Sequence, residues 1–280
     1  MRMLERLLLA AALAAAAAPA SAQFNFGNLS NLLDKAKTVV DAVKEPTEEE
    51  EIQIGQEFAA TLVGAKPLDG DARLQRYVNT LGRWLALQTE RPDLPWTFGV
   101  LDDPGFNAFA TPGGHIFVTR GLINRMRSEA ELAGVLAHEI GHVLKKHHLS
   151  AVKKNAWANI LSEVGGKAIK MDDPRVKSYL VNFGRKLYAS GLDQADEFEA
   201  DRVGVVIAAR AGFDAYGLPS VLQMLQAQSG QDGLFSLMFK THPSPERRIE
   251  VLDGLMGGKF DKLPASTGKP VAARLEEIGK

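Results

Sequence analysis

The chain has 280 residues, enough for one large domain or two small ones with a substantial apolar core. Its formal net charge is −1 at pH 7 and no basic stripe stands out, which argues against nucleic acid as a partner. Cysteine is absent, and this excludes disulfides, cysteine nucleophiles, cysteine-ligated metals and a lipid-anchored N-terminal cysteine.

The N-terminal residues have the features of a secretory signal peptide. A basic start is followed by an apolar run at residues 7–18 and by an A-x-A cleavage site at residues 20–22. An uncleaved membrane anchor is the alternative, but the run is shorter than the about 20 residues that a span needs. We therefore expect a signal peptide over 1–22, cleavage after Ala22, no transmembrane segment in the mature chain, and a periplasmic product.

The mature chain opens with an amphipathic segment over 23–46. Its lysines and acids balance, so we expect it to pack on the main domain rather than to bind anionic lipid. Thr47 and Glu50 then form a capping box, which predicts a helix toward Val63. A second amphipathic helix is expected over 71–88.

Two strand candidates follow, at 96–101 and 115–119. The segment 107–114 between them contains Pro-Gly-Gly and is expected to be a turn. Since no parallel β-α-β alternation is evident, we predict that the two strands form part of a small antiparallel sheet beside the next helix.

The segment from Ser128 to Ser150 is the most informative one. Ser128 and Glu131 make a capping box, and apolar residues recur at helical spacing, which predicts a helix buried on most faces. A neighbouring element could approach the helix backbone closely at its small residues, which are Ala133, Gly134, Ala137 and Gly141. We interpret His147 and His148 as cations at the helix C-terminus, where the helix dipole favours positive charge.

This helix carries the H-E-x-x-H pattern at residues 138–142. Helical periodicity places His138 and His142 one turn apart on one face, with Glu139 beside the first imidazole. The arrangement is typical of zinc hydrolases, although an ordinary helix with two histidines also matches it. A catalytic zinc takes three protein ligands and keeps a fourth position for water, so the hypothesis requires a third ligand elsewhere.

Two candidates for this third ligand lie downstream. Glu197 and Asp201 are one helical turn apart, so one carboxylate can bind metal while the other orients a ligand, although a solvated acidic face shows the same pattern. The alternative is His148, at the metzincin spacing from His142. The metzincin pattern needs a glycine between these histidines to turn the chain, and Lys145 stands there instead.

The rest of the chain is predicted to be mainly helical. Helices are expected at 151–170, 174–190, 194–210, 218–228 and from Ser244 onward. The helix at 174–190 is expected to pack in the core, with a lid over the active site as the alternative. The polar residues 259–280 are expected to form a partly disordered tail.

Four separate segments carry a resemblance to a known family. They are 138–142, 197–201, 107–122, and Thr241-His242-Pro243 with Arg248. In this order, over about 47–255, they resemble metallopeptidase family 48, which includes HtpX-like, BepA-like and CAAX prenyl protease relatives. The resemblance implies an α+β, mostly helical gluzincin (zincin) fold with a small antiparallel sheet, a metallopeptidase domain over 47–258, and the soluble periplasmic branch of the family.

The resemblance also assigns roles to individual residues. One zinc ion per chain would be held by His138, His142 and Glu197. Glu139 would be the general base that accepts a proton from the attacking water, and Asp201 would support the ligands from behind.

Two further parts of the site rest on the same resemblance. An extended substrate would pair with an edge strand made of His115, Ile116, Phe117, Val118 and Thr119. His242 would face the zinc, either stabilising the oxyanion or silencing the enzyme as a fourth ligand, and Arg248 would support the oxyanion or the His242 loop. Without the resemblance, the segment around His242 is simply a loop that caps the last helix.

These features predict a zinc-dependent metalloendopeptidase that hydrolyses peptide bonds of unfolded or misassembled envelope proteins, with the envelope assembly machinery as a candidate partner. The alternative is a periplasmic chaperone or assembly factor on the same scaffold with latent protease activity. The intact Glu139 argues against a dead enzyme but not against a latent one. A third hypothesis is a zinc hydrolase acting on a non-protein substrate such as peptidoglycan cross-links.

Overall fold

The computed structural model describes residues 46–151, 191–228, 233–235, 242, 244–263 and 266–278. They all belong to one compact unit, Glu45–Val164 with Ile169–Lys280. The other unit, Met1–Lys44 with Gly165–Ala168, lies outside the described residues. The predicted signal peptide, nearly all of the predicted 23–46 segment and nearly all of the two helices predicted at 151–170 and 174–190 also lie outside them.

The predicted helices that fall within the described residues are all present, with small shifts at their ends. The longer helices are α3 (Glu48–Ala65), α4 (Ala72–Ala86), α6 (Glu129–Leu144), α9 (Gln194–Arg210), α10 (Gly217–Gln228), α12 (Pro245–Met256) and α13 (Val271–Ile278). Short helical turns are η2 (Pro112–Gly114), α5 (Arg120–Ile123) and η3 (Gly233–Phe235), and the strands are β1 (Thr97–Leu101), β2 (Ala108–Thr111) and β3 (His115–Thr119).

Side-chain caps explain where several helices begin. Thr47 and Glu50 form the predicted capping box at α3, each side chain accepting from the other residue's backbone N–H. At α6 the Ser128 hydroxyl accepts from the backbone N–H of Glu131 at 3.2 Å. Each cap satisfies backbone donors that the first turn of a helix leaves without an intrahelical partner.

The small sheet has three strands in the order β1-β3-β2. β3 runs antiparallel to β2 but parallel to β1, so the antiparallel pairing predicted for 96–101 and 115–119 is wrong. The pairing differs because the first half of the segment 107–114, which was expected to be a turn, forms the strand β2. The hairpin β2-η2-β3 puts β3 in the centre, and β1 then pairs along the other side of β3.

The predicted substrate edge strand, 115–119, is therefore not an edge strand. β3 exchanges ladder hydrogen bonds on both sides and has no row of backbone groups left for a further strand. β2 is the outer strand next to β3 in the sheet that the structure describes. Sequence alone misplaced it because a four-residue strand with two alanines has weak β-propensity.

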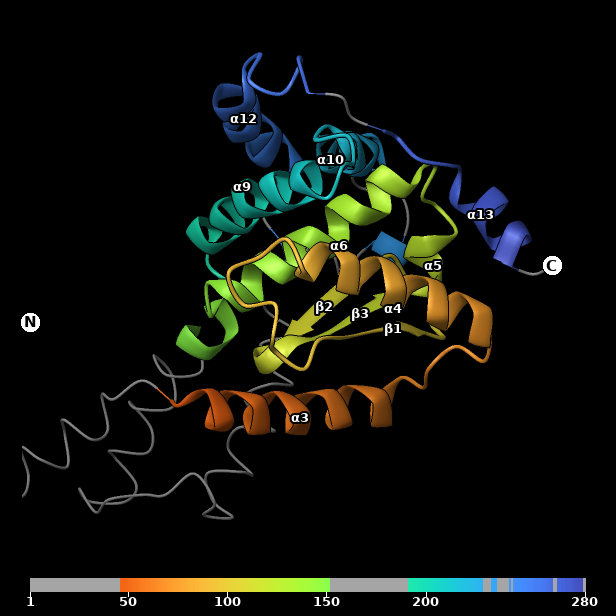
Figure 1. Ribbon diagram of the computed structural model, residues 1–280, viewed down its shortest axis with the longest axis vertical. Helices are drawn as coiled ribbons and strands as arrows, with labels where there is room; N and C mark the ends of the chain where they lie inside the picture. Colours follow the sequence, from red (N-terminus) through yellow and green to blue (C-terminus); the bar gives the residue numbers. More distant parts are fainter. Residues whose placement is uncertain are drawn as a thin grey trace, which may run out of the picture. The chain divides into compact units, whose positions relative to one another are not determined.

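Helices cover both faces of the sheet. Figure 1 shows α3 on one side and α4 and α6 on the other, with α9, α10 and α12 beyond α6. The strands alternate accordingly: Phe109 and Phe117 pack with Leu62 of α3, whereas their neighbours in the strands join the main core around α6. Within the described part of the chain, no helix combines the length and apolarity needed to cross a membrane.

Every residue of α6 is buried, and small residues let other helices approach its backbone. A Cβ on Gly134 would lie 2.7 Å from the backbone nitrogen of Leu218 in α10. Gly204 of α9 faces α6 in the same way, because a Cβ there would lie 2.8 Å from the backbone nitrogen of His138. The prediction that a neighbouring element approaches α6 closely at its small residues is confirmed, and the close contact fixes α9 against the H-E-x-x-H segment.

The C-terminal residues differ from the expected tail. The segment 266–278 lies against the start of α6, where the carbonyls of Lys269 and Thr267 accept from the backbone N–H groups of Glu129 and Ala130 at 3.1 Å. The buried Glu129 carboxylate also accepts from the Arg274 side chain of α13 at 2.8 and 3.0 Å. These bonds satisfy the first backbone donors of α6 and hold α13 on the domain.

The close contact at Gly204 leads to a stability prediction. Gly204→Ala is expected to lower the free energy of unfolding of the metal-free protein by about 1–3 kcal/mol, because the methyl group would force α9 away from α6. Denaturant unfolding measures this. The matched control is Gly254→Ala in α12, where a Cβ meets nothing within 4 Å, and a neutral or stabilising change of up to about 1 kcal/mol is expected. Equal stability of the wild type and Gly204→Ala would contradict the packing described.

Candidate active site

The H-E-x-x-H segment places two imidazoles side by side in the core. His138 and His142 lie one turn apart on α6, and their Nε2 atoms are 3.1 Å apart. The rings meet edge to face, with an interplanar angle of 88°. Burial lowers the pKa of His142 well below its usual range, so this imidazole is neutral and keeps a nitrogen lone pair.

Helix α9 brings a fully buried carboxylate to these imidazoles. Glu197 has no exposed surface, and its Oε1 lies 3.4 Å from His142 Nε2 while its Oε2 lies 3.6 Å from His138 Nε2. Burial by itself raises the pKa of Glu197, but the surrounding imidazoles hold it well below its ordinary value. The carboxylate is therefore ionised and points to the same place as the two Nε2 atoms.

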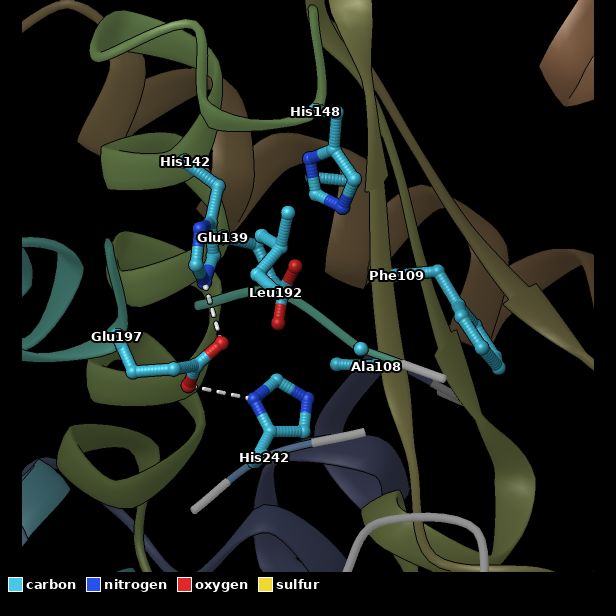
Figure 2. A pocket seen from close by; sticks show the side chains of 10 residues that line it. Ala108, Phe109, Glu139, His142, His148, Leu192, Glu197 and His242 are labelled. Carbon is cyan, nitrogen blue, oxygen red and sulfur yellow. Dashed lines mark hydrogen bonds and ion pairs between the residues drawn. The ribbon is translucent and has the colours of Figure 1, made fainter. Parts of the chain in front are cut away.

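His242 adds a fourth group from the segment that precedes α12. Its Nδ1 lies 2.6 Å from Glu197 Oε2. One donor atom from each of His138, His142, Glu197 and His242 falls within 4.8 Å of all the others. Figure 2 shows Glu197 between His142 and His242, with Glu139 facing the same pocket.

The donor set fits a zinc ion. With zinc–nitrogen bonds of about 2.0–2.1 Å, tetrahedral ligand atoms lie about 3.3–3.4 Å from one another. The separations among His138 Nε2, His142 Nε2 and the Glu197 oxygens are 3.1, 3.4 and 3.6 Å. In addition, Glu197 Oε1 is a buried oxygen without a hydrogen-bond partner among the described residues, as expected of an atom that binds a cation. Two imidazoles and a carboxylate are also a donor set that suits zinc.

A buried ion pair supports His138 from behind. Asp201 Oδ1 lies 2.9 Å from His138 Nδ1, and Arg248 donates to the same carboxylate from Nε at 2.8 Å and from Nη2 at 2.5 Å. Burial tends to raise the pKa of Asp201, but Arg248 and His138 lower it to about 2. The ionised carboxylate accepts the Nδ1 hydrogen of His138, which leaves Nε2 to face the cluster.

Without a metal, the same arrangement favours a proton on His138. Burial and Arg248 lower the pKa of His138, yet the carboxylates of Asp201 and Glu197 outweigh them and raise it to about 9. Since only the neutral imidazole binds a metal ion, metal binding would displace this proton.

Arg248 lies behind the cluster rather than at the pocket. Its guanidinium is buried against Asp201 and is not among the residues that line the pocket. The expectation that Arg248 supports the oxyanion or the His242 loop stays a prediction. In its place behind the cluster, the side chain holds Asp201 and approaches Glu197 Oε2 at 3.6 Å.

The pocket in front of the cluster is bounded by the sheet and by α6. Its walls are Ala108, Phe109, Ala110, Glu139, His142, His148, Gly191, Leu192, Glu197 and His242. Three of these residues belong to β2, so the sheet edge meets the cluster, whereas no residue of β3 lines the pocket. The volume of about 30 Å³ leaves room for a water molecule near Glu139.

Glu139 is buried at the pocket wall, directly beside the first imidazole. Burial raises its pKa above the ordinary carboxyl value. A carboxylate with a raised pKa is a better proton acceptor, which is the property that a general base in hydrolysis needs.

His147 and His148, which we interpreted as cations at the helix end, are both buried. They are 4% and 9% exposed, and burial lowers the pKa of His148 to about 3. Lys146 adopts a positive φ of 55°, which turns the chain so that both imidazoles return toward His142. Local sequence contains no signal for this turn, since lysine rarely adopts this conformation. His148 lines the pocket but stays outside the four-residue cluster, so Glu197 rather than His148 joins the two α6 histidines.

The fold, the buried donor cluster and the adjacent carboxylate together define a metal-dependent peptidase of the zincin type. Residues 72–256 match Peptidase family M48, and the chain belongs to this family, as its motifs predicted.

Proteins similar to this chain are named as a protease or a metalloendopeptidase. The chain is 30% identical over 206 residues to the beta-barrel assembly-enhancing protease of Escherichia coli K12, covering 71% of this chain and 42% of that protein. It is 35% identical over 162 residues to the mitochondrial metalloendopeptidase OMA1 of Arabidopsis thaliana, covering 57% and 31%, respectively. The chain thus spans less than half the length of these relatives.

The cluster leads to a prediction on metal binding. Alanine at His138, His142 or Glu197 is expected to abolish stoichiometric zinc binding, and Asp201→Asn to weaken it about 10–100-fold, because the amide no longer holds the His138 ring as firmly. Competition with a chelating dye measures the affinity. Glu250→Gln, a change at an exposed carboxylate of α12, serves as the control. Wild-type affinity in Glu197→Ala would show that the metal is held elsewhere.

Proposed function

We propose that this chain is a zinc-dependent metalloendopeptidase that hydrolyses peptide bonds of unfolded or misassembled envelope proteins. The proposal rests on the convergence of His138, His142 and Glu197 on one point, with Glu139 at the wall of the same pocket. Membership of peptidase family M48 supports the reaction class. The chain begins with a predicted signal peptide, and one relative is named for beta-barrel assembly, which supports the envelope as the compartment.

In this proposal each residue has a separate task. His138, His142 and Glu197 would hold one zinc ion, which would supply Lewis-acid activation of water and of the substrate carbonyl. Glu139 accepts a proton from the attacking water and then donates it to the amide nitrogen that leaves. Asp201 and Arg248 keep the His138 ring in its binding orientation.

We assign substrate binding to β2 rather than to β3. β3 is paired on both sides, whereas β2 is the outer strand of the described sheet and lies beside Glu139 and His142. A polypeptide in extended conformation would add to the sheet through backbone hydrogen bonds, with little dependence on its sequence. This mode of binding suits unfolded chains and disfavours a peptidoglycan substrate, which offers no comparable peptide strand.

We further propose that the mature protein starts at Gln23 in the periplasm and that residues 47–258 form the peptidase domain. The amphipathic segment 23–46 precedes that domain, and residues 259–280 follow it. The envelope assembly machinery remains a candidate partner of the proposed enzyme, supported by the name of one relative alone.

A second candidate function is a latent protease that acts mainly as a chaperone. The observation in its favour is the position of His242, whose Nδ1 lies 2.6 Å from Glu197 and inside the donor cluster. There it would occupy the fourth metal position and keep out the attacking water. His242 as an oxyanion donor is the competing role, since it also lines the pocket.

The central prediction concerns Glu139. Zinc-loaded wild-type protein is expected to cleave an unfolded polypeptide such as casein, and Glu139→Gln to lose at least about 100-fold in rate, because the amide cannot accept the proton. The variant is expected to keep its zinc, since Glu139 does not belong to the donor cluster. Gel analysis of the products measures cleavage, and a chelator in a parallel reaction tests the metal. Wild-type rates in Glu139→Gln would refute its role.

A separate prediction concerns His242. If His242 occupies the fourth metal position, His242→Ala raises kcat/KM for casein at unchanged zinc content, and this is the result we expect. A fall of about 100–1,000-fold would instead identify His242 as an oxyanion donor. Absence of cleavage by both proteins, each carrying one zinc, would favour the chaperone function.

A further inference from the structure

The two imidazoles of the H-E-x-x-H segment are supported by different partners. Behind His138 stands the carboxylate of Asp201, 2.9 Å from its Nδ1. The Nδ1 of His142 faces a third imidazole instead, because His147 Nδ1 lies 2.9 Å away. His147 is only 4% exposed and belongs to the segment that Lys146 turns back toward the cluster.

The groups near Nε2 of His147 determine whether its Nδ1 donates or accepts in the contact with His142. Its Nε2 lies 3.4 Å from Glu199 Oε2 and 3.8 Å from Asp196 Oδ1, both on α9. Ionised carboxylates only accept hydrogen bonds, so they favour a hydrogen on His147 Nε2. In a neutral imidazole the other nitrogen, Nδ1, then carries a lone pair and accepts.

The acceptor role of His147 Nδ1 determines the tautomer of His142. Because His147 Nδ1 accepts, the 2.9 Å contact requires the hydrogen of His142 to sit on Nδ1. The Nε2 of His142 then keeps its lone pair, and this is the atom that lies 3.1 Å from His138 Nε2 and 3.4 Å from Glu197 Oε1. The opposite tautomer would point a hydrogen into the donor cluster and prevent metal binding.

We propose that His147 is a positioning residue that fixes the tautomer and the ring orientation of His142 for metal binding. It does for His142 what Asp201 does for His138, with Glu199 and Asp196 setting its own tautomer from the protein surface. This inference rests on the metal site of the proposed function and adds a residue that does not contact the metal itself.

Three variants of His147 test the inference in the full chain. His147→Leu removes both ring nitrogens, His147→Asn keeps an acceptor near the position of Nδ1, and His147→Gln keeps a polar group nearer to Nε2. Zinc affinity is measured by competition with a chelating dye, and the visible spectrum of the cobalt-substituted protein reports ligand geometry. We expect His147→Leu to bind zinc about 10–100-fold more weakly and to show an altered cobalt spectrum. His147→Asn is expected to recover most of the affinity and the wild-type spectrum, and His147→Gln to recover neither.

Wild-type affinity and spectrum in His147→Leu would overturn the inference. Equal losses in His147→Asn and His147→Gln would overturn it as well, because a general packing defect does not distinguish the two ring nitrogens. If His147→Leu fails to fold, the comparison of His147→Asn with His147→Gln still tests the inference. If the wild type and the three variants show the expected zinc affinities but the wild type does not cleave casein, the result counts against the proposed function alone. A wild type that binds no zinc would overturn both the inference on His147 and the proposed function.

Discussion

The close contact between α6 and α9 is the constraint on which the rest of the site depends. Glycine at 204 lets the backbone of α9 reach His138, and this approach brings Glu197 and Asp201 to the imidazoles of α6. Burying two carboxylates is costly unless charged or hydrogen-bonding partners replace the lost water. The imidazoles of α6 and the guanidinium of Arg248 in α12 provide those partners, so the carboxylates of α9 would be buried without partners if α9 moved away.

A second buried network holds the two sides of the pocket together. Glu51 of α3 is 1% exposed and accepts from Arg91 at 2.9 and 3.1 Å. The same carboxylate accepts from the backbone N–H of Gly113, just after β2, and approaches Lys146, just after α6. One buried charge therefore links the end of the outer strand to the turn that carries His147. The position of β2 relative to the H-E-x-x-H helix is thus determined by specific bonds as well as by packing.

The surroundings of the cluster show how a metal site can be prepared before the metal binds. Two imidazoles are oriented from behind by different chemistry, a carboxylate–guanidinium pair for His138 and an imidazole for His142. Groups held in this way lose little conformational freedom when a ligand arrives. The protein places these supports on helices and on the turn after α6, which keeps the pocket wall formed by β2 available for substrate in the proposed function.

The sequence by itself determined the helices of the described residues, the H-E-x-x-H face and the family, because these depend on spacing within one helix or on motifs of a few adjacent residues. Its residues left Glu197 and His148 open as the third partner of the two histidines, and the resemblance to the family favoured Glu197. The sequence did not indicate the outer strand β2, the contact of Arg248 with Asp201, the burial of His147 and His148, or the packing of residues 266–278 on α6. Several of these depend on groups far apart in the chain: Arg248 contacts Asp201, His147 contacts Glu199 in α9, and β1 pairs with β3. The position of His147 also depends on the rare backbone conformation of Lys146. Local propensity carries no information on such contacts, so only the tertiary structure decided which groups stand behind the site and which strand borders it.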